Sequence, residues 1–116
     1  MNTIILWHNP RCSKSRAGLA LLEEKGIETK VLRYLDTPPT EEEIRTVLGK
    51  LGINARALMR TKEAIYKELG LKDVQDEQQL IAAMAAHPKL IERPVLIRGD
   101  KAVIGRPLEN IEAFLK

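Results

Sequence analysis

The sequence predicts a single domain, residues 1–116, of the α/β or α+β class, built on a mixed sheet of about four strands with flanking helices. Three observations lead to this prediction. The chain opens with a strand–helix–strand pattern, continues through several helices, and closes with two strands and a helix. Its 116 residues match the usual length of one domain, and no linker, repeat or low-complexity tract divides them.

The opening unit alternates between strand and helix periodicity. Residues 3–7 (TIILW) are apolar and stop at His8-Asn9-Pro10, which predicts a buried strand followed by a loop. A helix is expected from Ser13 to the basic Lys25 and Gly26. Residues 30–35 predict a second strand, and a helix of about a dozen residues between two strands favours a parallel crossover. The apolar positions of this helix are Ala17, Leu19, Ala20, Leu21 and Leu22.

The middle of the chain is predicted to be helical. Thr37-Pro38-Pro39 breaks the preceding strand, and Thr40 with Glu43 three residues later has the pattern of a capping box. Residues 55–69 predict two short helical pieces around Arg60-Thr61, and residues 76–87 predict a further helix closed by Pro88. The helix after Thr40 ends at Gly52 and has an apolar stripe at Ile44, Val47, Leu48 and Leu51.

The end of the chain returns to strand character. Residues 94–97 and 102–104 are apolar runs on either side of Gly99-Asp100, which predicts a β-hairpin. A last helix is expected to begin with Pro107 at its first position and to run through Leu115.

Composition excludes several classes of function. The net charge of +3 is spread along the chain and there are only four aromatic residues, so nucleic-acid binding has little support. The longest apolar stretch, residues 80–86, is far shorter than the roughly 20 residues of a membrane span, and the first residues do not resemble a secretion signal. A single cysteine excludes an internal disulfide and a multi-cysteine metal site, and is typical of a reducing cytoplasm.

Cys12 is the candidate reactive residue, because it lies where the first strand passes into a helix. Unpaired N–H groups and the positive end of the helix dipole favour a thiolate there, and can also bind an oxyanion. Arg11, Lys14 and Arg16 add positive charge, as His8 does when protonated. The alternative is an inert, buried thiol. The polar, turn-forming neighbours of Cys12 favour the reactive interpretation.

Cys12 and Ser15 form a C-x-x-S pattern, in which serine replaces the resolving cysteine of a dithiol motif. Such a site can still form a mixed disulfide with an external thiol. Ser15 is a candidate hydrogen-bond donor to the Cys12 sulfur, the alternative being a solvated serine in the first turn. For His8 the alternatives are a modulator of the thiol pKa, a packing residue or a solvated loop residue.

Five segments occur in order along the chain: HNPRCSKSR (8–16), YLDTPPT (34–40), ARALMR (55–60), HPKLIERPVLI (87–97) and GRP (105–107). Together they resemble the glutaredoxin-coupled arsenate reductase family. The resemblance implies a thioredoxin-like fold with a helical insertion between the βαβ and ββα parts. It also implies that Cys12 is the nucleophile and that Arg60, Arg93 and Arg106 bind the substrate anion, with Pro94 in the cis form.

The same resemblance implies the reaction, a step in arsenic detoxification. Arsenate is reduced to arsenite through a Cys12 thiol–arsenate adduct, with glutathione as co-substrate, glutaredoxin as partner and no bound cofactor or metal. Guanidinium groups suit a tetrahedral oxyanion because they bind it through paired hydrogen bonds. Structural alternatives for these side chains are a helix cap for Arg60, a surface ion pair for Arg93 and a position before a helix for Arg106.

Two other functions remain open from the sequence. One is a glutathione-dependent thiol oxidoreductase acting on another oxyanion or on mixed disulfides. The other is an Spx-like regulator that binds RNA polymerase, although Ser15 stands where such proteins usually carry a second cysteine. Plasmid-type arsenate reductases commonly continue beyond the last helix, so the resemblance is to the shorter chromosomal members. A monomer is expected, because no coiled-coil pattern is present.

Overall fold

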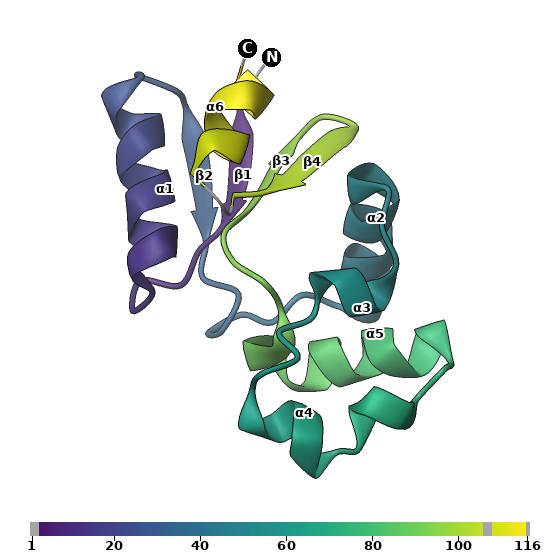
Figure 1. Ribbon diagram of the computed structural model, residues 1–116. Helices are drawn as coiled ribbons and strands as arrows, with labels where there is room; N and C mark the ends of the chain where they lie inside the picture. Colours follow the sequence, from purple (N-terminus) through teal and green to yellow (C-terminus); the bar gives the residue numbers. More distant parts are fainter. Residues whose placement is uncertain (1–2, 106–107, 116) are drawn as a thin grey trace. The chain divides into compact units, whose positions relative to one another are not determined.

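The computed structural model describes residues 3–105 and 108–115 (Figure 1). The chain divides into two compact units. The first comprises the chain up to Thr37 and again from Arg93, and the second comprises Pro38–Glu92. The sheet and Cys12 belong to the first unit, and the inserted helices form the second. A single domain over residues 1–116 stays a prediction.

The first unit is built on a four-stranded sheet in the order β2-β1-β3-β4. Strands β1 and β2 are parallel, whereas β3 is antiparallel to both β1 and β4. The predicted mixed sheet, parallel crossover and C-terminal hairpin are therefore confirmed, and the strand order is that of a thioredoxin-like fold. The strands are β1 (Ile4–Trp7), β2 (Thr29–Leu32), β3 (Val95–Arg98) and β4 (Lys101–Ile104).

Strand β2 ends earlier than the sequence predicts. It stops at Leu32, and the Arg33 carbonyl accepts the N–H groups of Asp36 and Thr37, so residues 33–35 belong to a turn. In the sequence, Tyr34 continues the apolar pattern of the strand. In the structure it lies in this turn and is buried, with 1% of its surface exposed. Its ring packs beside Trp7, with 6.5 Å between the ring centroids. Burial alone therefore does not distinguish a strand from a well-packed turn.

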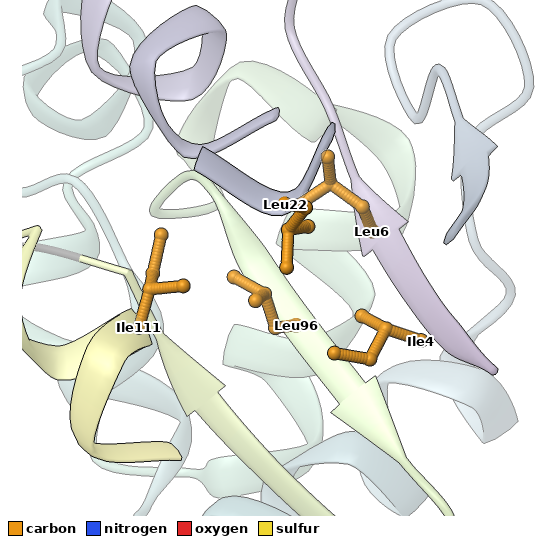
Figure 2. Packing of buried hydrophobic residues seen from close by; sticks show 5 residues of the cluster. All are labelled: Ile4, Leu6, Leu22, Leu96 and Ile111. Carbon is orange, nitrogen blue, oxygen red and sulfur yellow. The ribbon is translucent and has the colours of Figure 1, made fainter. Parts of the chain in front are cut away.

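Helix α1 (Ser13–Glu24) buries only part of its predicted apolar set. Leu19 and Leu21 pack against the core. Ala17 and Ala20 are exposed, whereas Ser15, Gly18 and Leu22 are buried. A Cβ atom at Gly18 would lie 3.0 Å from Ile111 Cδ1, so a larger residue there would require the Ile111 side chain to shift. Figure 2 shows the core of the unit, where the buried side chains of Ile4, Leu6, Leu22, Leu96 and Ile111 gather from α1, α6 and the sheet.

Helix α6 (Glu109–Leu115) closes the first unit and contributes Ile111 to the core. Its predicted start at Pro107 lies outside the described residues. Arg98 on β3 donates a hydrogen bond from Nη2 to the Phe114 carbonyl at 2.8 Å, and its guanidinium lies over the Phe114 ring. These contacts attach the last helix to the hairpin.

The second unit is helical, as predicted. Helix α2 (Glu41–Leu51) begins with the capping box of Thr40 and Glu43 and ends at Gly52 in the left-handed conformation. The two short helices on either side of Arg60-Thr61 are present, and α2 and α3 both pack against α5. The other elements are α3 (Ala55–Leu58), α4 (Ala64–Glu68), η1 (Leu71–Asp73), α5 (Glu77–Ala86) and η2 (Pro88–Leu90). Both 3-10 turns escaped the sequence analysis.

Over residues 3–105 and 108–115, no helix is both long enough and apolar enough to span a bilayer.

Candidate active site

The loop that carries Cys12 is held together by Asn9, a residue whose role the sequence did not reveal. The Asn9 carbonyl accepts the N–H of Cys12 at 3.0 Å, and Asn9 Oδ1 accepts the N–H of Arg11 at 3.0 Å. The Asn9 N–H in turn donates to Ser15 Oγ at 3.0 Å. These three hydrogen bonds fix the backbone from the end of β1 to the start of α1. Only the turn-forming Asn-Pro pair in the sequence signalled this loop.

Ser15 is fully buried, so the solvated alternative for this residue is wrong. Its Oγ lies 2.7 Å from His8 Nδ1 and also accepts the Asn9 N–H. Among the described residues, the partners of the Ser15 hydroxyl are therefore His8 and Asn9 rather than the Cys12 sulfur. The geometry gives Ser15 a positioning role, in which it joins the first turn of α1 to the end of β1.

His8 is buried beside Ser15, and its pKa is lowered from the usual 6.5. Burial is the main cause, and the positive charge of Arg33 acts in the same direction. His8 is therefore neutral near pH 7 and does not supply the positive charge that the sequence analysis considered. Because the unfolded chain binds this proton more tightly, His8 reduces stability as the pH falls below 6.5.

Cys12 is the N-cap residue of α1, with φ −95° and ψ 123°, and its half-buried thiol makes no regular capping hydrogen bond. The pKa of the thiol is lowered from its usual 9.0. Burial is the largest single influence and raises the pKa, but the backbone N–H of Ser15, the Arg93 guanidinium and the backbone N–H of Lys14 together outweigh it. The start of the helix therefore favours the thiolate, as the sequence predicts.

Arg93 acts on the Cys12 thiol from just before β3. Burial lowers the pKa of this guanidinium, but the interactions with Cys12 and Tyr34 raise that pKa by more than burial lowers it. Arg93 therefore stays charged. Its Nε is buried without a hydrogen-bond partner in the described residues, and no described carboxylate pairs with it. The alternative of a surface ion pair is therefore wrong. The peptide bond from Arg93 to Pro94 is cis, as the resemblance implies.

Tyr34 is the second site residue that the sequence analysis missed. It lies in the turn after β2 and interacts with the Arg93 guanidinium. The sequence assigned it to a strand, although it belongs to one of the segments that carry the family resemblance. Its contact with Arg93 arises only when the turn after β2 meets the start of β3.

Arg60 has a different environment in the second unit. Its Nη1 lies 2.6 Å from Glu63 Oε1, and its Nε lies 3.5 Å from Glu92 Oε1. Both contacts of Arg60 are ion pairs with carboxylates rather than a helix cap, and the N-cap position of α4 is occupied by Glu63. The third predicted arginine, Arg106, lies outside the described residues.

The described part of the first unit thus combines a thiol favoured as thiolate, a charged guanidinium with an unused donor, and backbone N–H groups at the start of a helix. A thiolate in this setting is a nucleophile suited to an anionic or disulfide substrate. No group of three or more histidine, cysteine, aspartate or glutamate side chains in the described residues is placed to hold a metal ion.

Sequence comparison identifies the family. The ArsC family matches residues 7–114, which is nearly the whole chain. The chain belongs to the ArsC family. An arsenate reductase of Neisseria meningitidis serogroup B is 54% identical over 117 residues, covering 99% of this chain and all of the relative. An arsenate reductase of Haemophilus influenzae is 47% identical over 115 residues, covering 97% of this chain and 99% of the relative.

The solved structures agree with this membership. An arsenate reductase from Vibrio cholerae matches this ArsC family member with a TM-score of 0.93 and 49% identity, over 97% of both chains. A protein described as a putative arsenate reductase from Yersinia pestis has a TM-score of 0.88 at 50% identity, again over 97% of both chains. The thioredoxin-like fold implied by the resemblance is thereby confirmed.

Proposed function

We propose that this ArsC family member is an arsenate reductase that uses glutathione and glutaredoxin as reductants. The observation that carries the proposal is Cys12 at the start of α1, with a lowered thiol pKa and the Arg93 guanidinium beside it. The relatives named as arsenate reductases support the choice of substrate. We place this activity in the cytoplasm, as a step in arsenic detoxification carried out by a monomer.

In the first step, the Cys12 thiolate attacks the arsenic atom of arsenate. A sulfur–arsenic bond forms, one arsenic–oxygen bond breaks, and the departing oxygen takes up protons and leaves as water. The backbone N–H groups of Lys14 and Ser15 and the Arg93 guanidinium stabilise negative charge at this place. Anion-binding roles for Arg60 and Arg106 stay predictions from the family resemblance.

In the second step, the thiolate of glutathione attacks the Cys12 sulfur. A disulfide forms, and the electron pair of the sulfur–arsenic bond stays on arsenic, which is reduced from As(V) to As(III). The two thiols supply the two electrons, and arsenite leaves. Because the chain has a single cysteine, the Cys12–glutathione disulfide needs an external thiol. A thiol of glutaredoxin attacks the glutathione sulfur and releases the Cys12 thiolate.

The test is oxidation of NADPH in the presence of glutathione, glutathione reductase, glutaredoxin and arsenate. We expect arsenate-dependent turnover by the wild-type protein, and a loss of more than about 10³-fold in Cys12→Ser, because that variant has no nucleophile. Circular dichroism should show that Cys12→Ser is folded. Normal arsenate turnover by the folded Cys12→Ser protein would refute the mechanism.

A thiol oxidoreductase is the second candidate, and the lowered pKa of Cys12 favours it as well, since thiol–disulfide exchange also proceeds through the thiolate. The same assay separates the two functions. Turnover with a glutathione mixed disulfide as substrate, combined with no response to arsenate, would select the oxidoreductase.

A further inference from the structure

A cavity beside the Cys12 loop has no role in the mechanism above. It measures about 260 Å³ and is lined by residues 8–11 on one side and by Arg33, Leu35 and Asp36 on the other. These two segments follow the carboxyl ends of the parallel strands β1 and β2, where ligands commonly bind in open sheets. Its volume equals that of roughly eight to nine water molecules at about 30 Å³ each.

The charged side chains around the cavity form no ion pairs within the described residues. The guanidinium groups of Arg11 and Arg33 form no ion pair with a described carboxylate, and Asp36 forms none with a described cation. The positive charge of Arg33 acts on His8 in the cavity wall. One small cavity therefore presents two guanidinium groups and one carboxylate, and this set suits a ligand that carries both a carboxylate and an ammonium group.

The cavity is close enough to Cys12 for one ligand to occupy the cavity and reach the Cys12 sulfur. Asn9 lines the cavity, and the hydrogen bond from the Cys12 N–H to the Asn9 carbonyl closes a turn between them. Such a turn brings its first and last Cα atoms to within about 7 Å. Two linked residues span about 7 Å when extended, so the cysteine of a peptide thiol can reach Cys12 while the adjoining residue occupies the cavity.

We propose that this cavity binds the γ-glutamyl end of the glutathione co-substrate, with the α-carboxylate on Arg11 and Arg33 and the α-ammonium group on Asp36. The γ-glutamyl end carries both charges on one carbon atom, whereas the glycyl end carries only a carboxylate, so the mixed charges of the cavity favour the former. This inference rests on the proposed use of glutathione as reductant. It assigns Arg33 and Asp36 to recognition of the thiol rather than of arsenate.

Binding of thioether analogues tests the proposal without any redox step. The probes are S-methylglutathione, γ-glutamyl-S-methylcysteine and S-methylcysteinylglycine, titrated into the full-length reduced protein and followed by calorimetry and amide NMR shifts. We expect the first two to bind with similar Kd and to shift the signals of Asn9 and Asp36. The third lacks the γ-glutamyl end and should bind at least about 10-fold more weakly.

Variants locate the contact. Arg33→Gln should weaken S-methylglutathione binding by about 5- to 10-fold, and Asp36→Asn by about 3-fold, through loss of one charge-assisted contact each. Lys30→Gln is the matched control, because it removes the same charge from an exposed position on β2, three residues before Arg33. It should leave Kd unchanged. Unchanged Kd in Arg33→Gln, equal binding of the cysteinylglycine probe, or no binding of S-methylglutathione would each overturn the proposal.

The outcomes also distinguish this proposal from the proposed function. Binding that depends on Arg33 in a protein without arsenate turnover would uphold the cavity and refute arsenate reduction. Arsenate turnover that depends on Cys12 but has the same KM for glutathione in wild type and Arg33→Gln would refute the cavity assignment and leave arsenate reduction intact.

Discussion

The first turns of α1 and α2 solve the same physical problem in different ways. Both helices begin with N–H groups that lack partners inside the helix. In α2, the Thr40 side chain accepts the N–H of Glu43, Glu43 accepts the N–H of Thr40, and Glu41 and Glu42 add negative charge. In α1, the N-cap residue is Cys12, its side chain makes no capping hydrogen bond, and the first turn has no acidic residue.

This difference separates a helix start built for stability from one left available for chemistry. At the third position of α2, Glu43 turns back to satisfy its own helix, whereas Ser15 at the same position of α1 turns away to His8 and Asn9. The N–H of the third residue, which α2 uses for its cap, acts on the Cys12 sulfur in α1, together with the N–H of Lys14. Substitutions at the two helix starts and at Arg93 test this contrast.

The largest effect is expected from Arg93→Ala, which removes the guanidinium that favours the thiolate. Arsenate turnover should fall by about 10²- to 10³-fold, as for the loss of one preorganised donor to an oxyanion. The pH midpoint of Cys12 alkylation should rise, because Arg93 lowers the thiol pKa. Arg93→Lys keeps the charge but not the planar fork and should lose less. An unchanged alkylation midpoint in Arg93→Ala would show that α1 alone activates the thiol.

Ser15→Ala should be the most destabilising of the helix-start changes. It leaves the buried Asn9 N–H without an acceptor and removes the partner of His8 Nδ1, at a cost of about 1–3 kcal/mol. Urea denaturation measures the loss. Ser13→Ala, at an exposed position two residues before Ser15, is the control and should lower the free energy of unfolding only slightly. Equal midpoints for the two variants would contradict the assigned hydrogen bonds.

Thr40→Ala removes the cap of α2 and should lower the free energy of unfolding by about 1 kcal/mol. The rate of Cys12 alkylation should not change, because the capping box serves only its own helix. Urea denaturation and alkylation with iodoacetamide give the two readouts. A change in alkylation rate would mean that the two helix starts are not independent.

The smallest effect is expected from a charge exchange at the second helical position, which is Lys14 in α1 and Glu42 in α2. Lys14→Glu should slow alkylation at pH 7 by about 2- to 5-fold, since a carboxylate there opposes the thiolate. Glu42→Lys should instead reduce stability by about 0.3–1 kcal/mol and leave alkylation unchanged. An alkylation rate that did not respond to Lys14→Glu would argue against control by the helix end.

Local features of the fold were readable from the sequence. The capping box, the left-handed Gly52 and the hairpin at Gly99-Asp100 depend on residues a few positions apart, and all three are present. The end of β2 was predicted wrongly and the buried face of α1 only in part, because both depend on what packs against them. Gly18 faces inward because Pro94 and Ile111 lie against it.

The site shows the same division. The sequence alone determined that Cys12 is the single thiol, that it lies at the start of a helix and that its neighbours are basic, because these properties are local. Only the tertiary structure decided that Ser15 is buried against His8, that His8 has a lowered pKa, and that Arg93 contacts both the thiol and Tyr34. Burial and pairing join residues that are distant along the chain, and no local pattern records them.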